Sequence, residues 1–381
     1  MSRSFSFRAF HRLGSAAAVA TLATLSACSE NIVEPVPSAP HGIVVLDGFV
    51  QPGLTLLADT GTASARVAFG PSTEFDAGGF TMERDTVLAV SSRGAGDLLY
   101  IADVRTGLVR RVQMPVRGNP GMARLLRGTG GSTLIGVALR DSGSIALVSI
   151  NGSATPVITR ITNVGLCPTD VFQFDNATWV VDANSSCRSN YAVQGDARLV
   201  RIPNTGTTRD TIVLSGARSS GVGALVVGDV AYIAAGGDAD FSGFPYTLRT
   251  SGTITKVDLR TRRVLTQRAM PVGSYGASTK LGGDGFLYVS LYENLTAFQN
   301  RTLKLRIDDL TTVGTGSPFL SLTTTGGDAV PCSSAVADAL GRVHCLVSGA
   351  ASATSLVVLN PAGVEIRRVP AGQGGVDLAL R

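Results

Sequence analysis

The side chains best suited to catalysis are scarce in this chain of 381 residues. Its three histidines are His11, His41 and His344. Only His344 lies beyond the N-terminal segment, in an apolar run typical of a buried strand, so a Ser-His-Asp triad or a histidine-rich metal centre would depend on this one residue. CxxC, GxSxG and phosphate-binding glycine loops are missing as well. The sequence singles out no catalytic residue, although 28 Asp and Glu residues leave carboxylate chemistry open.

One stretch has the oxygen spacing of a metal loop. Asp238, Asp240 and Ser242 occupy alternate positions, and a glycine follows at the sixth position. This is how a calcium-binding loop begins, because alternate side chains then face one hard cation. The twelfth position, where a bidentate Glu is expected, is Arg249. These three residues are our candidate metal ligands, and calcium is the only cofactor that the sequence suggests. The alternative is an ordinary polar turn.

Aromatic residues accompany this loop. Phe241, Phe244 and Tyr246 follow directly, and Tyr292 begins a later polar stretch. Rings beside polar side chains suit a binding surface, whereas packing onto the protein's own rim is the alternative. Our candidate binding residues are Asp238, Asp240, Phe241, Phe244, Tyr246 and Tyr292.

The N-terminus has the pattern of an export signal. Residues 1–27 contain three arginines, no acidic residue and an apolar run that is too short to span a bilayer. The run ends Leu-Ser-Ala-Cys, which resembles the lipobox of bacterial lipoproteins. The resemblance implies that Cys28 carries lipid and, with Ser29 after it, that the protein is anchored at the outer membrane. Ordinary secretion with cleavage after Ala27 is the alternative. Residues 28–41 then form a Pro-rich tether.

The charge balance gives no support for nucleic-acid binding. Lys and Arg number 33 in all, and three of these lie in the leader, which leaves 30 basic against 28 acidic residues. No cluster of basic and aromatic residues follows the leader. We therefore expect no nucleic-acid partner.

A turn between two short strands recurs through residues 42–381. In its clearest copy, Leu98–Ala102 and Val109–Met114 flank a turn in which Asp103 can accept backbone N–H groups and Gly107 can adopt a positive φ. Seven Asp or Asn residues recur in this way at steps of 44 to 54 residues: Asp59, Asp103, Asn151, Asn204, Asp258, Asp308 and Asn360. A period of about 40–50 residues made of short strands is typical of a β-propeller with four strands to a blade.

The two ends of the repeat region complement each other. The first unit has a second strand at Ile43–Asp47 but no inner strand before it, whereas Gly375–Arg381 forms a strand without a partner. Pairing these two strands would leave no sheet edge open. We predict an all-β fold, a seven-bladed β-propeller with four-stranded antiparallel blades, closed by the C-terminal strand joining the N-terminal blade. Two β-sandwiches would need a linker near the middle of the chain, and none is visible.

Two phrases carry a resemblance to a known repeat. They are LYIADVRTGLVRRVQMPVRGNPGMA at 99–123 and ITKVDLRTRRVLTQRAMPVGS at 254–274. They resemble the YVTN-type β-propeller repeat, from which this chain departs by longer insertions between the second and third strands. The resemblance implies the fold and no particular activity, because propellers include both binding proteins and enzymes.

The long connections favour one face of the predicted ring. They are Asn184–Ala197, Gly236–Gly252 and Tyr292–Thr302, each between a second and a third strand. Such connections share a face with those that join successive blades, so three of them in consecutive blades suggest a binding surface. Neutral variation in surface loops is the alternative.

Four cysteines remain after Cys28, and an even number in an exported protein predicts pairing. Cys167 and Cys187 lie in two connections on the same face of one blade, and Cys332 and Cys345 lie on or next to adjacent strands of another. The other pairings would join opposite sides of the ring. We therefore predict the disulfides Cys167–Cys187 and Cys332–Cys345, with four free thiols as the alternative.

These observations lead to two functional hypotheses. The first is a monomeric, non-catalytic, lipid-anchored module of the cell envelope that binds a protein or a glycan through its long-loop face. The alternative is an envelope hydrolase or lactonase-like enzyme that uses carboxylates, with or without a metal, in the central channel. The scarcity of histidine favours the first, and the run at Asp238 favours the second.

Overall fold

A computed structural model describes most of the chain from Gly42 onward. The described residues are 42–48, 50–58, 63–71, 77–91, 97–115, 117–128, 132–150, 155–204, 209–270, 278–294, 299–314, 319–323, 329–348 and 353–381. The chain divides into two compact units, Met1–Ala39 and Pro40–Arg381. The predicted leader, tether and Cys28 lie outside the described residues. Within those residues, no helix has the length and apolar character needed to cross a membrane.

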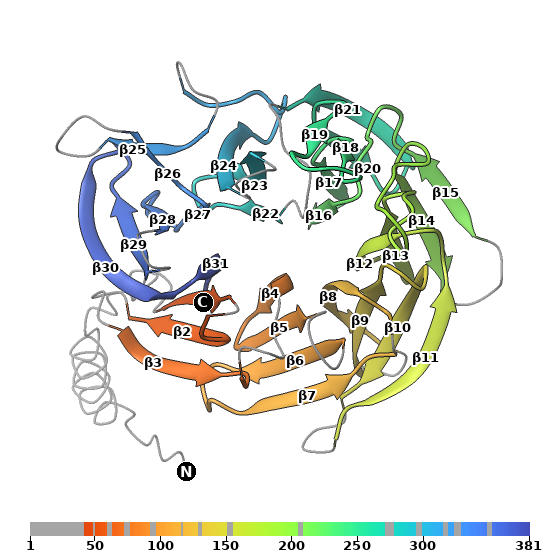
Figure 1. Cartoon of the computed structure of the whole chain (residues 1–381), viewed down its shortest axis with the longest axis horizontal. Helices are drawn as coiled ribbons and strands as arrows, with labels where there is room; N and C mark the ends of the chain where they lie inside the picture. The colour runs from red at the N-terminus through yellow and green to blue at the C-terminus, as the bar shows by residue number, and fades with distance from the viewer. Residues whose placement is uncertain are drawn as a thin grey trace, which may run out of the picture. The chain divides into compact units, whose positions relative to one another are not determined.

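The described strands of the second unit form seven blades around a common centre, each with one strand innermost (Figure 1). From the inner strand outward, the first blade consists of β31 (Gly375–Leu380), β1 (Ile43–Asp47), β2 (Gly53–Leu57) and β3 (Ala63–Ala68). The second consists of β4 (Ala77–Glu83), β5 (Thr86–Ser91), β6 (Leu98–Asp103) and β7 (Val109–Gln113). The third consists of β8 (Pro120–Arg127), β9 (Thr133–Leu139), β10 (Ser144–Ser149) and β11 (Val157–Asn163). The fourth and fifth are β12 (Pro168–Phe174), β13 (Ala177–Asp182), β14 (Arg198–Pro203) and β15 (Asp210–Val213); and β16 (Val222–Val227), β17 (Val230–Ala235), β20 (Thr253–Asp258) and β21 (Arg263–Ala269). The last two are β22 (Ser278–Leu281), β23 (Phe286–Asn294) and β24 (Gln299–Arg306); and β27 (Ser334–Ala337), β28 (Val343–Ser348), β29 (Ala353–Leu359) and β30 (Glu365–Gln373). The predicted seven-bladed, all-β propeller is confirmed.

The C-terminal strand closes the ring as predicted. β31 pairs antiparallel with β1, from Ile43 opposite Leu380 to Leu46 opposite Asp377. It is the inner strand of the blade whose other strands come from the N-terminal end (Figure 1). The side chain of Leu378 is fully buried between the first and last blades. The inner edge of β1 is therefore paired, and the first blade has four strands although its innermost strand comes from the other end of the chain.

The recurring turn has the predicted chemistry at Asp103, Asp258 and Asn360, whereas Asp59 and Asn151 lie outside the described residues. Asp103 Oδ1 accepts the backbone N–H groups of Arg105 and Thr106 at 2.9 and 3.0 Å, and Gly107 has a φ of +72°. The same side-chain caps occur at Asp258 and Asn360. In the sixth blade the capping residue is Asp309, which accepts the Thr311 N–H, one position after the predicted Asp308. A short side-chain acceptor thus fixes these turns through hydrogen bonds that are local in the sequence.

The sixth blade departs from the four-strand pattern. Its described sheet has three strands, and the outer position is taken by isolated bridges from Leu303 to Phe319 and from Leu305 to Thr312. A two-stranded ribbon, β25 (Ser321–Thr323) and β26 (Ala329–Pro331), follows. The predicted loop Tyr292–Thr302 is wrong for most of its length, because β23 and β24 continue to pair as far as Asn294 opposite Gln299. The strand-forming run Phe286–Tyr292 leads this ladder past the point where length alone suggested a loop.

The core lies between the blades. Among the described residues, seven apolar clusters each join two neighbouring blades. Trp179, for example, is 1% exposed and packs between the fourth and fifth blades. Second strands such as β13 and β17 are buried on both faces, whereas the outer strand β11 is largely exposed. Burial therefore holds the blades side by side and leaves their inner strands free to line a channel.

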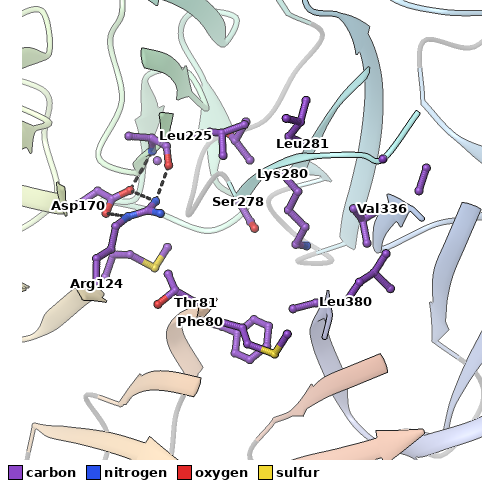
Figure 2. A pocket seen from close by; sticks show the side chains of 18 of the residues that line it. Phe80, Thr81, Arg124, Asp170, Leu225, Ser278, Lys280, Leu281, Val336 and Leu380 are labelled. Atoms are coloured by element: carbon purple, nitrogen blue, oxygen red, sulfur yellow. Dashed lines mark hydrogen bonds and ion pairs between the residues drawn. The ribbon is translucent and has the colours of Figure 1, made fainter. Parts of the chain in front are cut away.

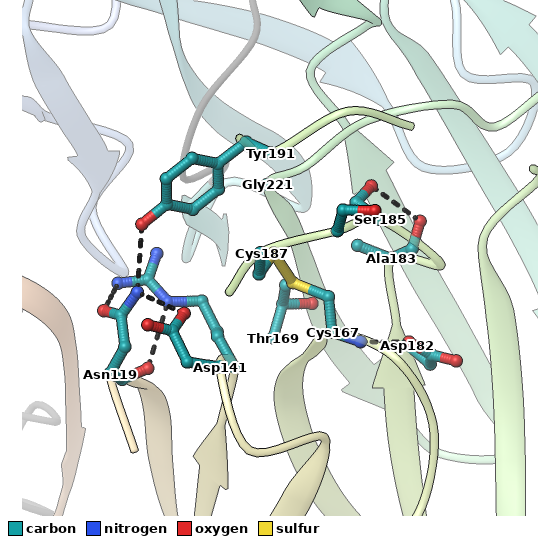
Figure 3. The surroundings of a disulfide bond; sticks show 12 residues. Asn119, Asp141, Cys167, Thr169, Asp182, Ala183, Ser185, Cys187, Tyr191 and Gly221 are labelled. Carbon is teal, nitrogen blue, oxygen red and sulfur yellow. Dashed lines mark hydrogen bonds between the residues drawn. A yellow bond between two sulfur atoms is a disulfide. The ribbon is translucent and has the colours of Figure 1, made fainter. Parts of the chain in front are cut away.

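Both predicted disulfides are present. Cys167 is bonded to Cys187 with a Cα–Cα distance of 5.6 Å, and Cys332 is bonded to Cys345 at 5.4 Å. The first joins the connection that enters the fourth blade to the long loop of the same blade (Figure 3). The second joins Cys332, two residues before β27, to Cys345 of β28.

Candidate functional site

The inner strands line a channel that contains two adjoining cavities. We call the cavity near the connections between second and third strands the mouth cavity; its volume is about 440 Å³. The cavity farther along the same strands, which we call the inner chamber, extends to the turns at Gly283 and Ala339 and has a volume of about 390 Å³. Phe80, Met122 and Ser278 line both. Both volumes lie within the range of about 300–1,000 Å³ that is typical of small-molecule sites.

The mouth cavity is bordered by a hydrogen-bonded network from three blades. Asn119, in the connection that enters the third blade, donates from Nδ2 to Asp141 Oδ1 at 2.9 Å and to the Tyr191 hydroxyl at 3.0 Å. Arg140 donates from Nη2 to Asn119 Oδ1 at 2.6 Å and is itself buried. Burial raises the pKa of Asp141, and the hydrogen bond from Asn119 partly opposes that rise. Figure 3 shows the Tyr191 hydroxyl directed toward this group.

A buried carboxylate holds Asn119 in position. Asp97 Oδ2 accepts the backbone N–H groups of Gly118 and Asn119 at 2.6 and 3.1 Å. Asn119 has a φ of +47°, a left-handed conformation that Asn tolerates better than most residues. The connection between the second and third blades is therefore fixed at the point where it borders the cavity.

The loop that carries Tyr191 is anchored at both ends. Its Cys187 is tied to Cys167, whose backbone N–H donates to Asp182 Oδ1 at 2.9 Å (Figure 3). Asp182 is fully buried and pairs with Arg198 at 2.5 Å. Tyr191 has a φ of +58°, which is uncommon for a bulky residue and is sustained only where the surroundings impose it. The structure thus holds this ring over the mouth cavity.

Three of the predicted binding aromatics form one cluster, together with Tyr191. The ring centroid of Phe241 lies 6.2 Å from Tyr191 and 5.2 Å from Tyr246, both edge-on. Phe244 lies 5.7 Å from Tyr246 and is 72% exposed. Tyr292, from the sixth blade, lines the mouth cavity directly with Asn300 of the facing strand. The long connections of the fourth and fifth blades and the hairpin of the sixth therefore border one region.

The predicted calcium ligands face arginines. Asp240 accepts the backbone N–H and the hydroxyl of Ser242 at 2.9 and 2.6 Å and the Arg249 guanidinium at 2.6 Å. The Ser242 hydrogen bonds, and then Arg249, lower the pKa of Asp240 to about 2. Asp238 is almost fully buried, with Arg218 at 3.9 Å. Within the described residues, no group of three or more His, Cys, Asp and Glu side chains could hold a metal ion. Arg249, at the position expected for Glu, supplies the positive charge that a cation would bring.

Two ion pairs lie in the channel wall: Arg124 and Asp170 both line the inner chamber, and Lys280 of the chamber pairs with Asp377 of the mouth. Figure 2 shows the first pair together with Lys280. Arg124 donates to both oxygens of the buried Asp170 at 2.8 and 2.7 Å, and Asp170 also accepts the Ala224 N–H at 2.9 Å. These contacts link the inner strands of the third, fourth and fifth blades.

The second pair links the sixth, seventh and first blades. Lys280 pairs with Asp377 and donates to Ser334 Oγ at 2.7 Å. Asp377 also accepts from Ser334 at 2.6 Å and from Ser278 at 3.1 Å. The closing strand β31 is therefore bound to its neighbours through the channel wall as well as through its ladder with β1.

His344 has a structural contact. Its Nε2 lies 3.0 Å from Asp338 Oδ2, which also accepts from Arg342 at 2.6 Å. Burial lowers the pKa of His344, with Asp338 opposing the shift. Asp338 borders the inner chamber, but His344 is not among the residues that line it.

No known family matches the chain, and neither does any curated protein. Among solved structures, a putative 6-phosphogluconolactonase from Bacteroides fragilis superposes with a TM-score of 0.54 at 14% identity, over 91% of this chain and 98% of that one. A protein from Lactobacillus plantarum superposes at 0.50 with 14% identity, over 89% and 98% of the two chains. A functionally unknown protein from Desulfotomaculum acetoxidans does so at 0.50 with 10% identity, over 72% and 81%. The chain is similar to these proteins in fold. At these identities, a similar fold does not indicate a shared activity.

Proposed function

We propose that this protein is a lipid-anchored β-propeller of the bacterial cell envelope, of YVTN-repeat type, which binds glycans at the mouth of its central channel. The observation that carries the proposal is the mouth cavity. Its lining combines tyrosine rings, amides and hydroxyls, exemplified by Tyr191, Tyr292, Asn119, Asn300 and Thr169. Amides and hydroxyls can both donate and accept hydrogen bonds, as sugar hydroxyls do, and aromatic rings offer an apolar face beside them.

The charges at the mouth favour an uncharged ligand. Asp377 is paired with Lys280, and Arg140 donates to Asn119 beside Asp141. A ligand carboxylate or phosphate would have to compete with these bonds, whereas hydroxyl groups would add to the network. A neutral sugar unit of a glycan meets this requirement better than a charged peptide does.

Binding is tested on the full chain with Cys28→Ser, which should make it soluble, by glycan array followed by calorimetry with the best glycan. We expect Tyr292→Ala and Asn300→Ala each to weaken binding at least tenfold, because each removes a group that lines the mouth. Asn204→Ala, an exposed Asn in a turn on the opposite face, is the matched control and should leave the affinity unchanged. Equal affinities in all variants would place binding elsewhere.

The lipid anchor is tested separately. The lipobox-like Leu-Ser-Ala-Cys run predicts that Cys28→Ser releases the protein from the membrane fraction and abolishes incorporation of a labelled fatty acid. Ala27→Gly, which keeps a small residue before the cysteine, is the control and should remain membrane-bound. Unchanged fractionation of Cys28→Ser would refute the anchor without affecting the glycan proposal.

The second candidate is a lactonase-like hydrolase. Its support is the presence of the carboxylates of Asp170 and Asp377 in the channel wall and the fold-level similarity to a protein named as a putative 6-phosphogluconolactonase. Both carboxylates already form ion pairs, Asp170 with Arg124 and Asp377 with Lys280. Turnover of a sugar lactone that is lost in Asp170→Asn or Asp377→Asn, with folding intact, would favour this candidate over a binding module.

A further inference from the structure

The mouth cavity and the inner chamber are consecutive parts of one channel. On β4, Ala77 to Phe80 border the mouth and Phe80 to Met82 border the chamber. The same order holds along β16, β22 and β31, where early residues line the mouth and later ones line the chamber. A ligand seated at the mouth therefore has the chamber directly beneath it.

The two parts differ in polarity. The mouth contains amides, hydroxyls and tyrosines, as described above. Apart from its ionic groups, the chamber wall is mainly apolar, with residues such as Phe80, Leu225, Leu281, Val336 and Leu380 (Figure 2). The channel thus changes from a polar to an apolar lining along its length.

Each ionic group that lines the chamber has a partner of opposite charge, and Asp338 pairs with Arg342 at 2.6 Å outside the chamber. Arg124 is held by both oxygens of Asp170. Lys280 is held by Asp377 and Ser334. A ligand group that enters the chamber gains little from its own charge, because it would have to break one of these pairs. It gains instead by covering apolar surface.

We propose that the channel binds one uncharged amphiphile, with a hydroxyl-rich head at the mouth and an alkyl-like tail in the inner chamber. The inference of a hydroxyl-rich head rests on the proposed glycan-binding function, and the binding of a tail in the inner chamber goes beyond it. Such a ligand has the chemistry of a glycolipid or an alkyl glycoside, in which one end forms hydrogen bonds and the other is driven out of water.

The test uses glucose and its methyl, butyl, hexyl and octyl β-glucosides, each below its micelle concentration, titrated calorimetrically into the full chain carrying Cys28→Ser. We expect the affinity to rise with chain length by about fourfold per buried methylene until the chamber is filled. The slope of log Kd against chain length reports the chamber, and the affinity of the shortest glucoside reports the mouth.

Two variants separate the two parts. Leu225→Glu places a charge in the chamber wall and should flatten the slope, while Leu225→Met should keep it. Asn300→Ala, at the mouth, should weaken the whole series by a common factor and leave the slope unchanged. Ile161→Glu, at a 52% exposed position on the outer strand β11, is the matched control for an added charge and should change neither quantity.

The outcomes distinguish this inference from the proposed function. Equal affinities for methyl and octyl glucoside would overturn the amphiphile inference and leave glycan binding intact. The same conclusion would follow if another glycan bound saturably and octyl glucoside did not. A slope that survives in a folded Leu225→Glu variant overturns it too. An effect of Leu225→Glu without any effect of Asn300→Ala contradicts the placement of the head and, with it, the proposed function.

Discussion

We predict that the Asp47 carboxyl contributes more favourably to the stability of the fold in mild acid than at neutral pH. Asp47 is the last residue of β1, where this strand pairs with both β2 and the closing strand β31, and its side chain is fully buried. Thr55 donates to Oδ2 at 2.7 Å, and Arg66 lies 3.8 Å away. Burial raises the pKa of Asp47 to about 6, and Thr55 and Arg66 only partly oppose this rise.

The sign and size of the effect follow from the pKa. Because the folded pKa lies above the unfolded value of 3.8, the fold prefers the protonated carboxyl, and the unfolded chain binds fewer protons between these two values. Above about pH 6 the charged carboxylate lowers the free energy of unfolding by about 3 kcal/mol, a penalty that is relieved progressively down to about pH 4. Asp47→Asn replaces the titrating carboxyl group with an uncharged amide of the same shape.

We expect Asp47→Asn to raise the free energy of unfolding at pH 7 by about 2–3 kcal/mol, which is about 3–4 °C in Tm for a unit of this size. The gain should fade as the pH falls to about 4. Denaturant titrations of both proteins at several pH values measure it. Asp103→Asn is the control of opposite sign, because the Thr106 N–H and other hydrogen bonds lower the pKa of Asp103, so its carboxylate stabilises the fold at neutral pH. A pH-independent difference for Asp47→Asn, or a variant less stable than the parent at pH 7, would refute the reasoning.

Three further predictions concern the contacts that hold the channel. Asp170→Ala leaves Arg124, which is 26% exposed, without its partner and should lower the free energy of unfolding in denaturant titrations by about 2–3 kcal/mol. Adding Arg124→Met should recover part of this loss. No recovery would mean that the loss does not come from the unpaired arginine. Cys187→Ser should lower the stability by about 3 kcal/mol and weaken glycan binding, because it frees the loop of Tyr191; binding unchanged in calorimetry would show that this loop is held without the disulfide. Leu378→Ala should cost about 3 kcal/mol by thermal unfolding, since its fully buried side chain joins the first and last blades, and an unaltered Tm would contradict closure by β31.

Local signals in the sequence predict much of the fold. The Asp103 turn, the closing strand and both disulfides follow from residue types whose preferences act over a few residues or from the absence of a partner strand. The shift from Asp308 to Asp309 shows the limit of such reasoning. Both residues can cap a turn, and only the pairing of the surrounding strands decides which one does.

The mouth cavity was only partly predictable. Phe241 and Tyr246, which lie beside the mouth, come from a polar connection that the sequence marks by its length, whereas Tyr292 lines the mouth from β23 and not from the predicted loop. Asn119 and Arg140 come from short connections in other blades, and nothing in their local sequence separates them from ordinary turn and strand-end residues. They meet because blade packing places residues far apart in the sequence along one rim.

The inner strands explain why the residues that line the channel are hard to predict from the sequence. β4 begins Ala-Gly-Gly and β22 reads Ser-Thr-Lys-Leu, so neither shows the apolar pattern of a core strand. Some of their glycines permit close approach rather than turns: a Cβ on Gly79 would lie 2.2 Å from the carbonyl oxygen of Gly121, and one on Gly121 would lie 2.7 Å from that of Thr169. The inner strands of the second, third and fourth blades thus touch backbone to backbone at the mouth, where only glycine fits. The inner-strand residues at the mouth are therefore small or polar, and the same composition elsewhere in the chain would indicate a loop.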